Sequence, residues 1–115
     1  MVWRVEQAEA VNRDLELIFD FLFDAAIALG EDAETAFDRA ATRIAAIQIA
    51  AMALAGAPHQ GTLREDIAPG LRQVTKDRAI FYFELDAEAH CLRLLAVFFG
   101  GQDHRRHMLR RLLMR

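Results

Sequence analysis

Two histidines near the C-terminal end of this chain have the type and spacing for acid–base chemistry. His104 and His107 are three positions apart, and Arg105 and Arg106 stand between them. Histidine exchanges protons near neutral pH and arginine binds phosphate, so such a cluster has the groups needed to act on a phosphodiester. A solvated basic helix end explains the same residues without any chemistry, and this is the interpretation that we favour.

The same histidine pair is a weak candidate for a metal site. A protein-bound zinc ion needs at least three protein ligands, and no third ligand is apparent in the sequence. His59 and His90 fall in predicted loops, and Cys91 is the only cysteine. We therefore predict no metal site and no cofactor. The lone cysteine also excludes an internal disulfide, which fits a reducing cytoplasm.

A second group of cations accompanies the segments that we expect to be strands. Arg72, Arg78 and Arg93 lie on or beside these segments, and Tyr82 lies within one of them. Charged side chains of a half-covered sheet project from the face that helices leave open. We expect the four residues to form a concave basic patch on that face. The alternative is that these charges alternate along exposed strands without any binding function.

The C-terminal segment after residue 103 is basic and amphipathic. Leu109, Leu112 and Leu113 form an apolar stripe among many arginines. As a structural element it would cover an edge of the sheet while its arginines reach solvent. As a functional element it would contact nucleic acid, a target protein or an acidic partner. A membrane surface is the least favoured of these partners because the segment is short.

Charge is divided unevenly along the 115 residues, whose net charge is −3. Residues 1–58 carry 4 basic and 10 acidic side chains, whereas residues 59–115 carry 10 basic and 7 acidic ones. This asymmetry indicates an anionic partner for the second half, or local solvation of each face. The length fits one domain, residues 1–115. The most apolar stretch, residues 44–57, falls short of the roughly 20 residues that span a bilayer, so we predict a cytoplasmic protein.

Helical periodicity dominates the first half of the chain. Apolar residues from position 11 to 29 recur at spacings of three and four, which predicts a helix ended by Gly30. A second alanine-rich helix is predicted from about residue 32 to 55, with Gly56 and Pro58 ending it. The short link between the two helices indicates an antiparallel hairpin.

The remaining segments read as strands, apart from the last. A short strand is predicted around residues 3–6, and others at residues 71–74, 79–85 and 91–99, the last of them central. Residues 58–70 form a loop with one helical turn at most. Lys76 and Asp77 are expected to turn the chain, and Asp103 to cap a helix over residues 104–114.

Together these elements predict an α+β fold. An N-terminal strand and an α-helical hairpin pack on a small antiparallel sheet, a meander of three strands, and a basic helix follows at the C-terminus.

This order resembles the architecture of the ParE/RelE superfamily of bacterial toxins, and the local sequence agrees with the resemblance. The entry to the meander reads Pro69, Gly70, Leu71, Arg72, as in the family. The aromatic run of residues 80–86 and the run of residues 94–103 resemble the family's third and fourth strands. Each motif is weak alone, and their order over nearly the whole chain carries the resemblance.

The resemblance implies the toxin of a type II toxin–antitoxin module, of the plasmid stabilisation type. Such a toxin arrests growth and is neutralised by a cognate antitoxin, with which it forms a hetero-oligomer; a homodimer is also open. ParE-like members poison DNA gyrase, whereas RelE-like members cut messenger RNA on the ribosome.

Departures from the ribonuclease pattern favour the ParE-like branch. Arg72 matches the arginine at the meander entry, but Gln102 and His104 stand where that branch has arginines, and Met108 stands in place of its late tyrosine. We therefore expect target binding rather than catalysis, without closing the question of enzymatic activity. The alternatives are a ribonuclease that uses Arg72 with His104 or His107, and an inactive or regulatory binding protein.

The residues predicted to contact the target or the antitoxin come from the strands and from the start of the last helix. They are Arg72, Arg78, Tyr82, Arg93, Gln102, Asp103, His104, Arg105 and Arg106.

Overall fold

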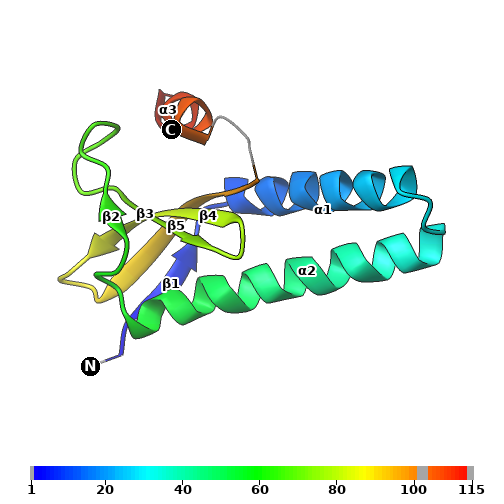
Figure 1. Ribbon diagram of the computed structural model, residues 1–115. Coiled ribbons are helices and arrows are strands. Elements are labelled where there is room, and N and C mark those ends of the chain that lie inside the picture. The colour runs from blue at the N-terminus through cyan, green and yellow to red at the C-terminus, as the bar shows by residue number, and fades with distance from the viewer. Residues whose placement is uncertain (1, 101–103, 114–115) are drawn as a thin grey trace.

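A five-stranded sheet lies between two helical layers of unequal size (Figure 1). The computed structural model describes residues 2–100 and 104–113. Helices α1 (Ala10–Ala28) and α2 (Ala33–Ala53) form an antiparallel hairpin on one face of the sheet. Helix α3 (His104–Leu113) lies over the other face and runs across the direction of the hairpin. The predicted α+β class, the hairpin and the C-terminal helix are therefore confirmed.

Local signals explain where the hairpin turns. Gly30 has a φ of +96°, and the N–H groups of Gly30 and Glu31 donate to the carbonyls of Ile27 and Ala26. This is the Schellman arrangement that ends many helices, and glycine adopts its left-handed backbone without steric cost. Asp32 then caps α2, because its carboxylate accepts the Thr35 N–H at 2.8 Å. That hydrogen bond lowers the pKa of Asp32.

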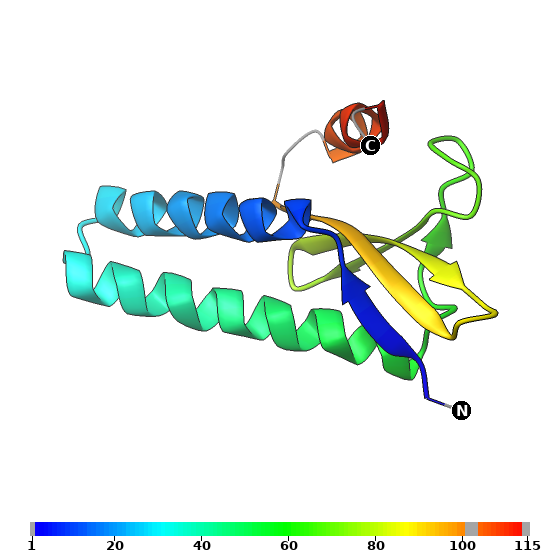
Figure 2. The ribbon, with the colours of Figure 1, turned by 180° about the vertical axis from the view of Figure 1, so that it is seen from behind.

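The strands are β1 (Arg4–Gln7), β2 (Thr62–Leu63), β3 (Arg72–Lys76), β4 (Ala79–Asp86) and β5 (Cys91–Phe99), in the spatial order β1-β5-β4-β3-β2. Strands β2 to β5 pair antiparallel, as the meander predicted, and β5 is interior. Strand β1 pairs parallel with β5 (Figure 2), which no local pattern indicates. The two-residue strand β2 was missed, because its length is below what alternation can reveal.

Two small features of the chain differ from the prediction. Helix α2 ends at Ala53 and continues as the 3-10 turn η1 (Leu54–Gly56), so the predicted helix end was two residues late. The turn between β3 and β4 consists of Asp77 and Arg78 rather than Lys76 and Asp77, since Lys76 already pairs with Ala79. Both turn residues have positive φ, as two-residue hairpins with the twist of a sheet require.

The two faces of the sheet bury separate clusters. Phe81 and Phe83 of β4 point toward the hairpin, where Leu15 and Ile18 of α1 and Ile47 of α2 meet them. The opposite face buries a smaller cluster beneath α3, formed by Leu71, Ile80, Tyr82, Leu95, Ala96, Phe98 and Met108. Alternate residues of one strand thus serve both cores, which accounts for the nearly continuous apolar runs of β4 and β5.

The hairpin is longer than the sheet that it covers. The residues of α1 that pack into the main core end at Leu22, and the distal part of the hairpin projects past the strands (Figure 1). The principal extents of 49 × 31 × 22 Å reflect this projection. Apolar side chains of the projecting part remain in solvent, among them Ile27, Leu29 and Phe37.

The loop that follows η1 passes close to strand β3 at Gly61, and a substitution there tests this close approach. A Cβ atom at Gly61 would lie 2.4 Å from the backbone oxygen of Gln73, and the φ of Gly61 is +82°. Gly30 also has positive φ, but nothing lies within 4 Å of its Cβ position. We expect Gly61→Ala to lower the free energy of unfolding by about 2 kcal/mol more than Gly30→Ala. Urea denaturation of both variants measures the difference, and equal losses would contradict the close approach.

Candidate functional site

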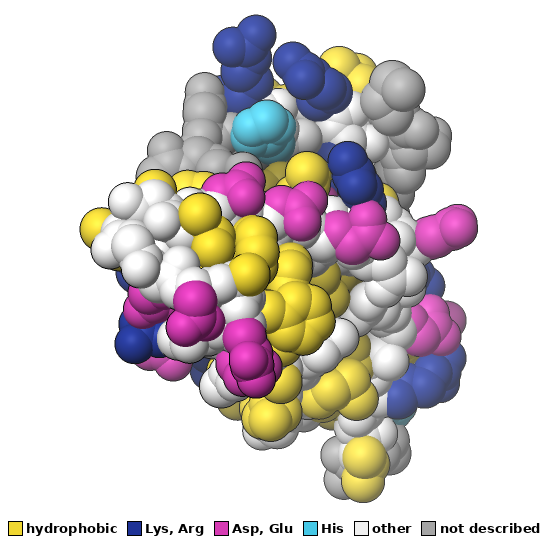
Figure 3. All heavy atoms as spheres, turned by 90° about the vertical axis from the view of Figure 1, so that its right-hand side faces the viewer, with side chains coloured by type: hydrophobic (Ala, Val, Ile, Leu, Met, Phe, Trp, Pro, Cys, Tyr) yellow, Lys and Arg dark blue, Asp and Glu magenta, His cyan; other side chains and the backbone are white. Residues whose placement is uncertain are grey.

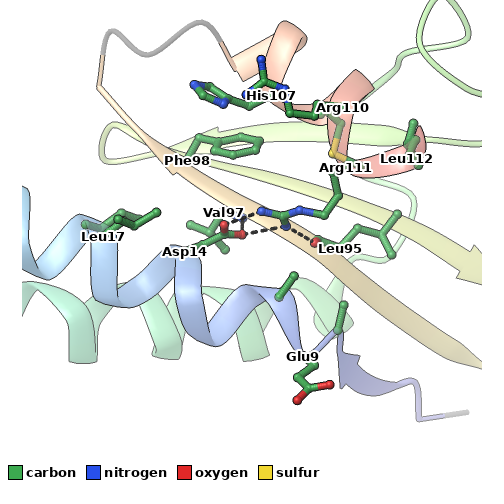
Figure 4. A pocket seen from close by; sticks show the side chains of 14 residues that line it. Glu9, Asp14, Leu17, Leu95, Val97, Phe98, His107, Arg110, Arg111 and Leu112 are labelled. Carbon is green, nitrogen blue, oxygen red and sulfur yellow. Dashed lines mark hydrogen bonds and ion pairs between the residues drawn. The ribbon is translucent and has the colours of Figure 1, made fainter. Parts of the chain in front are cut away.

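A groove of about 680 Å³ separates the first half of α1 from α3 (Figure 4). Leu17 and Ile18 of α1 form one wall, and Met108 and Leu112 of α3 form the other. Phe98 of β5 lies at its base. The groove is therefore mainly apolar, and its two walls come from segments at opposite ends of the chain.

A buried ion pair holds these two walls together. Asp14 is only 4% exposed, and its carboxylate accepts two hydrogen bonds from Arg111, at 2.6 and 3.0 Å. A bidentate arginine–carboxylate pair is among the stronger polar contacts in proteins. Among the described residues, α3 also contributes the buried Met108 to the core beneath it, and the Asp14–Arg111 pair adds a polar connection between α3 and α1.

The same pair also provides hydrogen-bond partners for backbone groups on the free edge of β5. Strand β1 ends at Gln7, opposite Leu94, so the outer edge of β5 beyond that point has no neighbouring strand. There Asp14 accepts the N–H of Val97 at 3.0 Å, and Arg111 donates to the carbonyl of Leu95 at 2.9 Å. An open sheet edge needs such partners when it is buried.

The sequence analysis did not single out Asp14 or Arg111. A signal was present, because Asp14 lies within the apolar stripe of Val11, Leu15 and Ile18 on α1. A carboxylate is rarely placed on the buried face of a helix without a partner. The identity of that partner could not be found locally, since Arg111 is 97 residues away.

Exposed polar side chains line the rim of the groove on the α3 side. His107 and Arg110 border it, and both side chains are exposed. The His107 ring lies 5.7 Å from the Phe98 ring, between centroids. On the α1 side Glu9 borders the groove, so its two rims carry opposite charges. A polar group of either sign on a bound segment would find a counter-charge here.

A second polar cluster joins the loop before β3 to the start of α3. Arg64 binds both carboxylate oxygens of Asp66, at 3.0 and 2.9 Å, and also the side chain of Gln73. Arg105 of α3 lies 3.4 Å from Asp66. Tyr82 lies beneath this cluster, and burial raises the pKa of its hydroxyl. The loop residues Arg64 and Asp66 were missed from the sequence, because loops carry no periodic pattern.

Acid should weaken this cluster. The Arg64 guanidinium lowers the pKa of Asp66 from 3.8 to about 2, with a smaller contribution from Arg105. A carboxylate with a depressed pKa stabilises the fold fully above its unfolded value, and this contribution is lost as the pH falls through about 2. We expect the NMR signal of the Asp66 carboxyl to titrate with a midpoint near 2, and Asp66→Asn to loosen the start of α3. A midpoint near 3.8 would show that the arginines do not hold the carboxylate.

The structure divides the predicted basic patch between the two faces of the sheet. Arg93 and Tyr82 lie on the α3 side, but Arg72 pairs in register with Phe83 and Arg78 stacks on Phe99, both of which face the hairpin. The prediction of a single concave patch was therefore wrong. Alternation along a strand shows that residues differ in face, but it does not show which face a helix covers.

Each predicted residue of this group has its own partners. Arg93 pairs with Glu84 at 3.1 Å, and Arg72 donates to the backbone oxygen of His59 at 2.8 Å. Tyr82 is fully buried, so it is a core residue rather than a contact residue.

Only some of the predicted contact residues near the C-terminus are described in the structure. Arg105 and Arg106 are exposed on α3 beside His107. Gln102, Asp103 and the side chain of His104 lie outside the described residues. Arg72 and His107 lie on opposite faces of the sheet, so the structure does not bring these two together; the other pairing named for ribonuclease chemistry, Arg72 with His104, involves a side chain outside the described residues.

Two further properties concern binding in general. In the described part of the chain, no group of three histidine, cysteine or acidic side chains is arranged to hold a metal ion. None of the described helices is both long enough and apolar enough to cross a bilayer.

The surface shows the division of charge that the sequence predicts. Seen from the end of the hairpin, basic side chains and a histidine gather over α3, and acidic side chains border an apolar area on the hairpin (Figure 3). Exposed apolar residues of the hairpin include Leu17, Phe21, Ile27, Leu29 and Phe37.

Comparison with known proteins identifies the fold. No protein-family model matches the sequence, and no curated protein sequence matches it. Among solved structures, the chain is similar to one in the toxin–antitoxin complex RelBE2 from Mycobacterium tuberculosis, with a TM-score of 0.59 and 16% identity over 89% of this chain and 95% of that one. It is also similar to a chain of the chromosomal ParDE system from P. aeruginosa, with a TM-score of 0.65 and 17% identity over 87% and 98%. The chain therefore has the fold of ParE/RelE toxins.

Proposed function

We propose that this chain is the toxin of a type II toxin–antitoxin pair, held inactive by a cognate antitoxin in the cytoplasm. The observation that carries the proposal is the shared fold. The two similar chains belong to assemblies described as toxin–antitoxin systems, and this chain covers 95% and 98% of them. Because fold alone does not determine function, the proposal also draws on the surface of this chain.

The toxic act that we propose is binding to a cellular target, with DNA gyrase as the target by analogy with ParE-like toxins. Exposed cations on α3 support a binding role, namely Arg105, Arg106 and Arg110, with His107 exposed beside them. The separation of Arg72 from His107 disfavours a ribonuclease that pairs these two residues, since a general acid and a phosphate-binding group must meet at one substrate.

The groove between α1 and α3 is the site that we assign to a bound protein segment. Its base is apolar, its rims carry His107 and Glu9, and its walls are fixed by the Asp14–Arg111 pair. Apolar anchors with charged borders are typical of protein interfaces. Exposed residues of α3, Arg105 and Arg106 among them, would contact the partner beside the groove.

The test is induction of this chain alone in bacterial cells, with growth, DNA supercoiling and RNA integrity followed together. We expect growth arrest with altered supercoiling and intact RNA. The variant Arg106→Ala/Arg110→Ala should relieve the arrest, whereas Arg13→Ala/Arg39→Ala removes the same charge from the hairpin and should not. Arrest with fragmented messenger RNA would establish a ribonuclease instead. Normal growth would overturn the toxin proposal and leave an inactive or regulatory protein.

A further inference from the structure

Two arginines that are distant in the sequence approach the same aromatic ring on the hairpin side of the sheet. The guanidinium carbon of Arg43 lies 5.3 Å from the centroid of the Phe99 ring, and that of Arg78 lies 5.2 Å from it. The Phe99 ring is also 6.3 Å from that of Phe21, which is 54% exposed. Two cations and a half-exposed aromatic side chain thus meet at one point of the surface.

Contacts within the chain limit the freedom of these cations before any partner arrives. Arg43 projects from α2 and donates to the backbone oxygen of Asp77. Arg78 belongs to the two-residue turn between β3 and β4, where Asp77 and Arg78 both have positive φ. Groups fixed in this way lose little conformational freedom on binding, which favours recognition.

Within the described part of the chain, neither Arg43 nor Arg78 forms an ion pair with a carboxylate. Other arginines of the hairpin do so, as Arg13 pairs with Glu16 and Arg39 with Glu31. Like charges that approach the same ring repel each other, so an anion beside them would relieve the repulsion.

We propose that Arg43, Arg78 and Phe21 form a docking surface for an acidic segment of a partner protein. Carboxylates of the segment bind the guanidinium groups, and an adjacent apolar side chain packs on Phe21. The inference deepens the proposed function, because an antitoxin is the partner that this surface would hold. It adds a second contact area beyond the groove beside α3.

A protein segment fits this surface better than a nucleic acid does. The first 58 residues, which include the whole hairpin, carry 10 acidic and 4 basic side chains. A nucleic acid carries regularly spaced phosphates and needs a continuous row of basic side chains to bind them. The acidic hairpin would repel these phosphates. A peptide needs only a carboxylate for each arginine and can place uncharged residues elsewhere.

The test uses the full chain and a labelled synthetic helical peptide of alanine, glutamine and leucine that carries two glutamates beside its leucine stripe, with fluorescence anisotropy as the readout. We expect the peptide to bind, and Arg43→Ala/Arg78→Ala to weaken binding by about tenfold or more. The control Arg13→Ala/Arg39→Ala removes the same charge from exposed positions and should change binding by less than about twofold. Phe21→Ala should also weaken binding, although it leaves the charge unchanged. Circular dichroism checks that every variant is folded.

Three outcomes would contradict the proposed docking surface. The first is that the peptide fails to bind, and the second is that both double variants weaken its binding equally. The third is that the chain prefers a single-stranded DNA oligonucleotide over the peptide and loses this binding in Arg43→Ala/Arg78→Ala. The measurement does not depend on toxicity, so this inference and the proposed function fail separately. Growth arrest without peptide binding would contradict only the proposed docking surface. Peptide binding without growth arrest would contradict only the proposed toxin function.

Discussion

Replacing Asp14 with alanine should lower the free energy of unfolding by about 3–5 kcal/mol. The substitution leaves Arg111 unpaired against the sheet and removes the acceptor of the Val97 N–H, which is buried. Domains of this size are stable by only about 5–15 kcal/mol, so the loss is a large fraction of the total. Urea denaturation followed by circular dichroism measures it, and hydrogen exchange should show faster exchange in α3.

Glu16→Ala is the matched control for Asp14→Ala. Glu16 also belongs to an ion pair on α1, but its side chain is 65% exposed, so its loss should cost no more than about 1 kcal/mol. The double variant Asp14→Leu/Arg111→Met should recover part of the lost stability, because it removes both charges together. Recovery should stay incomplete, since the Val97 N–H still lacks its acceptor. A loss for Asp14→Ala as small as that for Glu16→Ala would show that the pair does not tie α3 to α1.

The second large effect is expected at Phe81, in the centre of the main core. Its side chain is fully buried between the hairpin and the sheet, so Phe81→Ala leaves a cavity that the packed neighbours cannot fill. We expect a loss of about 3–5 kcal/mol in the free energy of unfolding.

Phe21→Ala is the natural comparison, because Phe21 is 54% exposed on the same side of the sheet. Its loss should cost less than about 1 kcal/mol, which also makes it a suitable variant for the peptide experiment. Thermal denaturation of the two variants under one set of conditions makes the comparison. Similar melting temperatures for both would mean that the hairpin does not pack on β4 as described.

The groove and the Arg43–Arg78 surface have different origins in the sequence. The basic character of α3 is plain from the residues themselves, and the structure adds only its place beside α1. The Arg43–Arg78 surface had no sequence signal of its own. Arg43 is one of several arginines on a helix, and Arg78 gains its role from a tight turn that places it against Phe99.

The chain by itself determined the elements and their class. Helical spacing on α1, the Gly30 and Asp32 signals at the turn of the hairpin, and the apolar runs of β4 and β5 all arise from interactions between near neighbours, so the sequence displays them directly. Only the tertiary structure decided that β1 joins β5, that Arg72 and Arg78 face the hairpin, and that Asp14 meets Arg111. These outcomes depend on which face each helix covers and on contacts between residues far apart in the chain. Such contacts produce no periodic pattern in the sequence around either residue.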